Sequence, residues 1–336
     1  HKNEKDKLLL SSWNLDPQNL PVNIFIPEGK REEYKTNNLP FDNTFALKSS
    51  ELEAEDWLSL FNLKITSLEG VLIQRIITNL QKERDYTIPE IITALENDKE
   101  TQKETKEISI ALFKAAETWG IFSLTEEGTN ISDLVSPGKT TVLDISVYST
   151  TQSFNIRALV ISLVSRKLFK SRLDARKKEE LESIYHGSEY LSAANKKEHP
   201  LIWIFLDEAH EFLPKNEKTP ATDALVQLLR EGRQPGISLV LATQQPGQIH
   251  KDVMSQSDIV LAHRLTAQAD ISALNEMMQT YLLANIKQYI DDLPSLKGSA
   301  IILDDNSERI YPMRVRPRFT WHGGEAPTAI KAEIKI

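Results

Sequence analysis

The chain has 336 residues, of which 40% are hydrophobic, and a formal net charge of −8. This length fits one large or two ordinary domains, and the acidic balance excludes a protein that coats nucleic acid with its whole surface, because such proteins are basic. The sequence has no cysteine, no apolar run near the roughly 20 residues of a membrane span and no signal-peptide pattern, so we expect a cytoplasmic protein without disulfides.

The N-terminal part is predicted to contain one strand, at residues 22–26, and then an all-helical block at residues 63–128. Apolar residues recur along this block at spacings of three and four, which is typical of helices. Thr87 and Glu90 show a capping-box pattern before the second helix, and Gly120 is expected to end the third. The predicted helices cover residues 70–80, 88–95 and 107–119.

From Pro137 onward, strands and helices alternate. An apolar helix is predicted at residues 154–169, and a charged arm, residues 170–182, follows it. Another helix is expected to begin at Thr219-Pro220, with a capping residue and then a proline in the first turn. The predicted strands are residues 141–147, 201–206, 237–243, 259–262 and 300–303. Strands separated by helices imply a parallel sheet with right-handed crossovers.

The most informative segment is residues 201–210, where six apolar residues run into Asp207 and Glu208. Such a run is typical of a strand buried on both faces, and open α/β sheets bind ligands at the carboxyl ends of their strands. One carboxylate there can hold Mg²⁺, and the next can orient or deprotonate an attacking water. We interpret this as the Walker B arrangement of an NTPase. The plainer alternative is a core strand that ends in a solvated acidic turn.

Two other nucleotide-site interpretations fail. The segment Gly138-Lys139-Thr140-Thr141 looks like the end of a P-loop, but Asp133 stands where the first glycine should be, and the segment enters a strand instead of opening a helix. We therefore expect a plain turn, and the 336 residues hold no other P-loop candidate. Asp207 to His210 spells the box of the two-lobed DEAH helicases, but too few residues follow it to form their second lobe.

Gln244 stands one residue beyond the predicted strand 237–243. A polar side chain on the strand next to Walker B can contact both the γ-phosphate and the attacking water. We therefore predict a sensor role for Gln244, the alternative being an ordinary glutamine between a strand and a loop.

Arg230 and Arg233 flank Gly232, which is expected to end the helix begun at Thr219. Cations near a helix C-terminus are favourable in any case. The functional interpretation is an arginine finger that reaches the γ-phosphate of a neighbouring subunit and stabilises transition-state charge. Arg233 lies beyond the glycine and is the better candidate of the two.

Two further basic stretches have two interpretations each. Arg166 to Lys178 precedes Glu179, Glu180 and Glu182, which favours pairing along a solvated helix, with DNA contact as the alternative. The tail from Arg314 to Gly324 interleaves arginines with aromatic residues. It is either a strand packed on the core or a contact to phosphates of nucleic acid or of a neighbour's nucleotide.

Four motifs together resemble the HerA-type ATPases, in the HerA/FtsK branch of RecA-like motors. They are Leu206 to Pro214 (LDEAHEFLP), Arg230 to Arg233 (REGR), Ala242 to Pro246 (ATQQP) and His322 to Gly324 (HGG). The match covers roughly residues 129–327, and its order and spacing are specific although each motif alone is not. The helical block is also similar to the helical insertion of those proteins.

The resemblance implies an α/β fold with a RecA-like parallel-sheet P-loop NTPase core and an all-helical insertion. It implies a homohexameric ring that moves double-stranded DNA through a central pore, with ATP and Mg²⁺ as cofactors. By motif, Asp207 would be the Mg²⁺-associated acid, Glu208 the catalytic base, Gln244 the sensor and Arg233, with Arg230 beside it, the finger. A NurA-like nuclease in DNA-end processing and repair, or another effector, would be the partner.

The family's P-loop and N-terminal β-barrel are missing, and we expect both to precede residue 1. The predicted division is a truncated first core segment (1–62), the helical insertion (63–128), the ATPase core (129–310) and a C-terminal tail (311–336). Two alternatives stay open. One is another motor of the superfamily, such as a conjugative coupling or packaging ATPase, and the other is a non-hydrolysing assembly module that lacks a P-loop.

Overall fold

The computed structural model describes residues 1–336 apart from 84, 126, 149–154, 187–199, 279–285, 308 and 322–336. The chain divides into two compact units, and each is treated by itself. The larger unit holds residues 22–257 and 272–277, and the smaller holds residues 1–21, 258–271 and 278–336.

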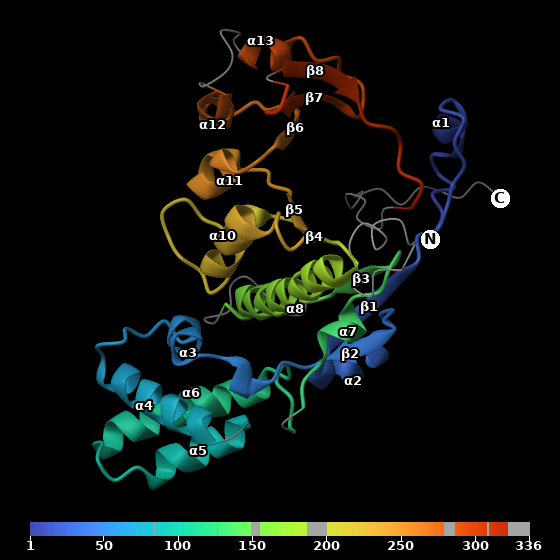
Figure 1. Ribbon diagram of the computed structural model, residues 1–336. Coiled ribbons are helices and arrows are strands. Elements are labelled where there is room, and N and C mark those ends of the chain that lie inside the picture. Colours follow the sequence, from blue (N-terminus) through green and yellow to red (C-terminus); the bar gives the residue numbers. More distant parts are fainter. Residues whose placement is uncertain are drawn as a thin grey trace, which may run out of the picture. The chain divides into compact units, whose positions relative to one another are not determined.

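A three-stranded parallel sheet opens the larger unit (Figure 1). β1 (Val22–Pro27) lies in the middle, between β2 (Asn43–Phe45) and β3 (Thr140–Leu143). Phe25 of β1 is in register with both Asn43 and Leu143. The turn at Gly138 leads into β3 and not into a helix, which confirms that this segment is not a P-loop. β3 is shorter than the predicted strand 141–147.

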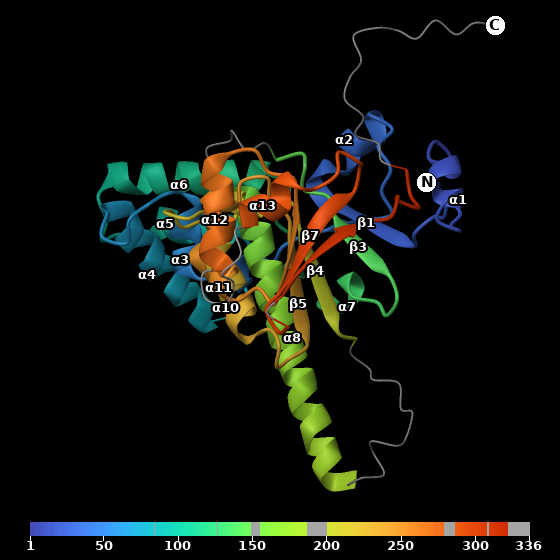
Figure 2. The same ribbon diagram turned by 90° about the horizontal axis from the view of Figure 1, so that it is seen from above.

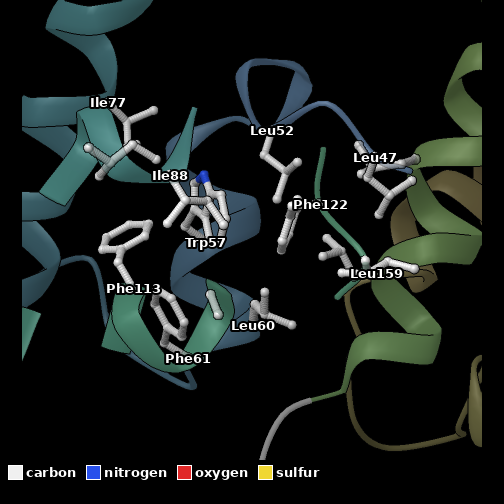
Figure 3. Close-up of a cluster of buried hydrophobic side chains, with 14 of the residues drawn as sticks. Leu47, Leu52, Trp57, Leu60, Phe61, Ile77, Ile88, Phe113, Phe122 and Leu159 are labelled. Carbon is white, nitrogen blue, oxygen red and sulfur yellow. The ribbon is translucent and has the colours of Figure 1, made fainter. Parts of the chain in front are cut away.

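The helical block consists of α3 (Ala54–Leu60), α4 (Leu68–Glu83), α5 (Ile88–Asn97) and α6 (Lys103–Thr118). The predicted capping box is present, since the Thr87 backbone N–H donates to Glu90 Oε2 at 2.9 Å. The core of the block centres on Trp57, whose ring lies 4.9 Å from that of Phe113 and 5.7 Å from that of Phe61 (Figure 3). The apolar side chains that recur at helical spacing are therefore buried together in the core of the block, as the sequence predicts.

α8 (Ile156–His186) is one helix of 31 residues, which Figure 2 shows as a continuous rod. The sequence predicted a shorter helix, 154–169, and a separate charged arm. The helix continues through the arm because Arg176 pairs with Glu179 (3.4 Å) and Glu180 (3.1 Å) at helical spacing. The prediction that the basic stretch lies wholly on a solvated face is wrong at Arg172, because the side chain of Arg172 is only 3% exposed.

Four short helical elements also belong to the larger unit and come before α8 in the chain. They comprise η1 (Glu28–Lys30), α2 (Arg31–Thr36), η2 (Ser49–Glu51) and α7 (Ile131–Leu134).

A second parallel pair is formed by β4 (Ile202–Leu206) and β5 (Ile237–Leu241). α8 and α10 (Thr222–Glu231) contribute apolar side chains to the core against which these strands pack. Three short elements follow the strands: η3 (Ala209–Glu211) after β4, and η4 (Pro246–Gln248) and α11 (Lys251–Ser255) after β5. The parallel α/β prediction is thus confirmed for β1–β3 and for β4–β5.

Two predictions about this region are wrong in detail. The strand at 201–206 is covered on one face only among the described residues, because Leu201, Trp203 and Phe205 are 64–70% exposed. α10 begins two residues later than predicted, with Ala221 before its first residue. The reason is that the Thr219 backbone N–H bonds to the Thr222 hydroxyl (2.9 Å), so Thr219 and Pro220 form a turn.

The smaller unit contains an antiparallel sheet, β6 (Ile259–His263), β7 (Ser299–Asp304) and β8 (Arg309–Arg314), in that order. The sequence predicted parallel neighbours for strands 259–262 and 300–303, and this is wrong. A short turn after Asp304 joins β7 directly to β8, and such a turn allows only antiparallel pairing. β8 also shows that the start of the basic tail is a strand.

The remaining helices are α1 (Lys7–Ser11), α12 (Gln268–Met278) and α13 (Ile286–Asp291). Near the chain ends, the Asn3 backbone N–H donates to Phe319 O at 2.9 Å, which ties the two ends of the smaller unit together. None of the helices in the described part of the chain is long and apolar enough to span a membrane. The predicted motif at residues 322–324 lies outside the described residues.

Candidate functional site

The acidic pair follows β4 and lies beside the end of β5. Backbone hydrogen bonds extend the strand pairing past both strands, from Ala242 N–H to Leu206 O (2.9 Å) and from Ala209 N–H to Ala242 O (2.8 Å). Parallel strands end at the same edge of a sheet. The structure therefore brings Asp207 and Glu208 together with Thr243 and Gln244.

Glu208 is the centre of this cluster. The Gln244 amide Nε2 donates to Glu208 Oε1 at 2.5 Å. The second carboxylate oxygen, Oε2, is buried and accepts no hydrogen bond from the described residues, although the side chain as a whole is 35% exposed. One oxygen of the carboxylate is thus held by the predicted sensor, while the other is turned into the structure, 3.5 Å from His210 Nδ1.

The backbone of Glu208 is strained. Its φ of 48° and ψ of 46° lie in the left-handed region, which costs an L-residue about 1–2 kcal/mol. The backbone N–H of Glu208 donates to Asp207 Oδ1 at 3.0 Å, and this hydrogen bond orients the carboxylate of Asp207. Strain of this kind persists where the surrounding structure over-determines a residue, and it clusters at functional sites.

His210 and Thr243 complete the cluster, and the sequence did not single them out. His210 Nδ1 lies 2.9 Å from the Thr243 hydroxyl and 3.5 Å from Glu208 Oε2. The same hydroxyl accepts from the Gln245 backbone N–H at 3.0 Å. The available signal was position in the sequence: Thr243 directly precedes Gln244, and His210 stands two residues after Glu208.

The loop that carries the acids is anchored to α8. Arg157 Nη2 bonds to Glu211 Oε2 at 2.5 Å, and its guanidinium lies 5.6 Å from the centre of the Phe212 ring. A cation that is bound both to a carboxylate and over an aromatic face is a strong contact when partly desolvated. Arg157 therefore supports Glu208 without touching it.

The predicted arginines do not join the acids within this chain. Arg230 lies in the last turn of α10, and its Nη2 pairs with Asp252 Oδ2 at 2.6 Å. Arg233 is exposed on the loop that precedes β5, whereas Gln244 follows β5. A five-residue strand is about 16 Å long. Arg233 is thus at the opposite end of the strand from Glu208 and Gln244.

The cluster cannot enclose a metal ion by itself. No group of three or more His, Asp or Glu side chains with metal-binding geometry occurs among the described residues. Mg²⁺ is commonly bound by one or two carboxylates together with water and the substrate's phosphates. Asp207 and Glu208 fit that mode of binding.

Comparisons with known proteins cover this region. The family model of zonular occludens toxin (Zot) matches residues 168–281, which include β4, β5 and the whole cluster. The DNA double-strand break repair helicase HerA of Pyrococcus furiosus is 26% identical over 188 residues, which are 52% of this chain and 32% of that protein. The probable HerA helicase of Methanocaldococcus jannaschii is 36% identical over 69 residues, 20% of this chain and 14% of that protein.

The chain thus spans at most about a third of the length of these two curated relatives. Among solved structures, VirB4 of Thermoanaerobacter pseudethanolicus is similar over 94% of this chain and 85% of that chain, at 12% identity and a TM-score of 0.50. At this identity the likeness is one of fold.

Proposed function

We propose that this chain, which is similar to P-loop ATPases of the HerA/FtsK type, provides the water-activating half of an ATP-hydrolysing site in a DNA-translocating motor. The observation that carries the proposal is the hydrogen bond between Gln244 Nε2 and Glu208 Oε1, at the carboxyl ends of two parallel strands. A carboxylate and an amide in contact at this place can bind one water molecule between them and the γ-phosphate.

Each residue of the cluster has a distinct proposed role. Glu208 would act as the general base, because its carboxylate contacts Gln244 at the carboxyl ends of the strands and its side chain is 35% exposed. Gln244 would orient that water and contact the γ-phosphate. Asp207 would hold Mg²⁺ through water or directly, and Mg²⁺ when bound would neutralise charge on the phosphates. A phosphate-binding loop would have to come from another segment, since the 336 residues contain none.

Arg233 is proposed to act on a neighbouring subunit. It lies at the opposite end of β5 from its own Glu208, and it forms no ion pair with the part of the chain that the structure describes. A ring of identical subunits would bring the Arg233 end of one chain to the Glu208 end of the next. We propose a homohexamer with Arg230 as a supporting residue, held by Asp252.

Double-stranded DNA is the proposed substrate, and DNA-end processing with a NurA-like nuclease or another effector is the proposed context. The names of the curated relatives, which are helicases of double-strand break repair, support this. A net charge of −8 fits DNA contact confined to a pore. We also propose the division into segments 1–62, 63–128, 129–310 and 311–336.

Two alternatives each have an observation in their favour. The fold is similar to that of VirB4, which fits another motor of the superfamily, such as a conjugative coupling or packaging ATPase. The lack of a GxxxxGK[ST] motif in the sequence fits a non-hydrolysing assembly module.

The decisive experiment is Glu208→Gln in the full-length protein. The amide cannot accept the proton, so ATP turnover should fall by about 10²–10⁴-fold, whereas ATP affinity should change little because the binding contacts remain. Steady-state turnover and equilibrium binding of a fluorescent ATP analogue measure the two quantities. A parallel loss of binding would show that Glu208 has a different role, and unchanged turnover would rule it out as the base. Absence of turnover in the wild-type protein would favour the assembly module.

A further inference from the structure

A five-residue loop, residues 232–236, joins α10 to β5 and carries Arg233. Its backbone is tightly closed, since Ile237 N–H donates to Gly232 O at 2.8 Å and Gly236 N–H donates to Arg233 O at 3.2 Å. Gly236 adopts a φ of +83°, which a residue with a side chain rarely takes. The position of Arg233 therefore depends on how this loop is held.

Arg172 of α8 contacts this loop from within the larger unit. Its Nε donates to Pro235 O at 2.8 Å, and its Nη1 lies 3.5 Å from Glu179 Oε1. The side chain is 3% exposed. A buried guanidinium costs several kcal/mol unless its charge and its donors are satisfied. Glu179 supplies the opposite charge, and the loop carbonyl supplies an acceptor.

The other arginines of this region are placed differently. Arg176 and Arg230 line the same groove as Arg233, but Arg176 pairs with glutamates of its own helix and Arg230 pairs with Asp252. Neither of these ion pairs reaches the backbone of the 232–236 loop. Among the side-chain hydrogen bonds and ion pairs described for Arg172, Arg176 and Arg230, only the bond from Arg172 Nε ends on the loop.

We propose that Arg172 is a positioning residue for Arg233. It holds the 232–236 loop in the conformation from which Arg233 reaches a neighbouring subunit's nucleotide, so this inference rests on the function proposed above. Loss of the Nε donor leaves the buried Pro235 carbonyl without its partner, and the loop then samples other conformations.

The first test measures the loop and does not depend on activity. The 336 residues contain no cysteine, so Gln234→Cys gives one site within them for a nitroxide spin label. Any cysteine in another segment of the full-length protein is first replaced by serine. Arg172→Met should increase the mobility of the label, as seen in its electron paramagnetic resonance spectrum. Arg166→Met is the matched control, since Arg166 is also on α8 and pairs with Asp56 at 2.7 Å, away from the loop. An unchanged spectrum in Arg172→Met would overturn the proposal.

The second test measures ATP turnover in the full-length protein without the label. Arg172→Met should lower kcat about ten- to a hundredfold while KM for ATP changes less than about twofold, because displacement of a catalytic group by about 1 Å has effects of this size. The double variant Arg172→Met/Arg233→Ala should be no slower than Arg233→Ala alone. A further loss in the double variant would mean that Arg172 acts through something other than Arg233.

Two outcomes separate this proposal from the proposed function. If Arg233→Ala leaves turnover unchanged, the finger role fails, while the spin label still reports whether Arg172 holds the loop. If Arg172→Met does not fold by circular dichroism, Arg172→Lys replaces it. Lysine keeps the charge opposite Glu179 but loses the forked donors, so label mobility should exceed that of wild type and kcat should lie between those of wild type and Arg233→Ala. Wild-type values for both would contradict the proposal.

Discussion

At Glu208, a strained backbone and a hydrogen-bonded carboxylate occur in the same residue. The left-handed conformation turns the chain sharply after β4, and this turn is what places Oε1 against the Gln244 amide. An alanine or an aspartate could end the strand without such strain in an extended conformation. The strain is consistent with a residue that is selected for the position of its side chain and not for stability.

This strain leads to a prediction about stability. Glu208→Gly should be more stable than Glu208→Ala by about 1 kcal/mol, because glycine adopts the left-handed region without penalty. Urea unfolding of the two variants measures the difference. The matched control is Glu107, exposed on α6, where alanine should be the more stable by about 1 kcal/mol. If alanine were more stable than glycine at position 208 as well as at position 107, the backbone of Glu208 would not be strained.

At the scale of elements, the helical block depends on a polar contact between α4 and the turn that joins α5 to α6. Arg75 Nη2 of α4 donates to Asp98 Oδ1 at 2.7 Å, and the Thr101 backbone N–H donates to Asp98 Oδ2 at 3.0 Å. Hydrogen bonding from Thr101, together with the charges of Arg75 and Lys106, lowers the pKa of Asp98 below its usual value. The folded block therefore stabilises the ionised form of Asp98.

Asp98→Asn should destabilise the chain by about 1–2 kcal/mol at pH 7, since it weakens a charge-assisted hydrogen bond. A lowered folded-state pKa stabilises the fold above the unfolded pKa of about 3.9 and loses this effect as the pH falls through the folded value. The difference between wild type and variant should therefore shrink below about pH 4. Thermal unfolding across pH measures it, and Glu107→Gln, in an exposed pair with Lys103, should show little effect at any pH.

For the whole molecule, the important relation is between the two ends of one pair of strands. Glu208 and Gln244 follow β4 and β5, whereas Arg233 precedes β5. The carboxylate with its glutamine and the arginine therefore lie at opposite ends of the strand pair. Parallel pairing in register from Ile202 to Leu206 makes this separation unavoidable. We therefore propose that a nucleotide contacted by both lies between two chains.

The prediction at this scale concerns mixed assemblies of the full-length protein. Arg233→Ala and Glu208→Gln should each be nearly inactive alone, and mixing them should restore part of the turnover, because some interfaces then combine an intact arginine with an intact base. ATP turnover as a function of mixing ratio measures this. A subunit carrying both changes should not rescue Arg233→Ala. If the single variants fail to complement each other, Arg233 does not act across subunits.

Much of the fold followed from local patterns. The helices α4–α6, the Thr87 capping box and the parallel pairing of β4 with β5 were all predictable, because helical periodicity, capping and apolar runs are short-range signals. The antiparallel pairing of β6, β7 and β8 was missed, since the direction of a strand depends on its partner and not on its own residues. The same holds for the exposed face of β4, where Trp203 and Phe205 read as buried residues.

Order along the chain and residue chemistry are enough to show that two carboxylates end an apolar strand and that a glutamine ends the next. The contact of Glu208 with Gln244 and His210, which Arg233 does not join, depends on how the strands pair in the folded chain. Folding also buries Arg172 against a loop 63 residues away in sequence, although Arg172 stands in a basic run that reads as solvated. Burial and contact are properties of the neighbours that folding brings, and a linear pattern does not contain them.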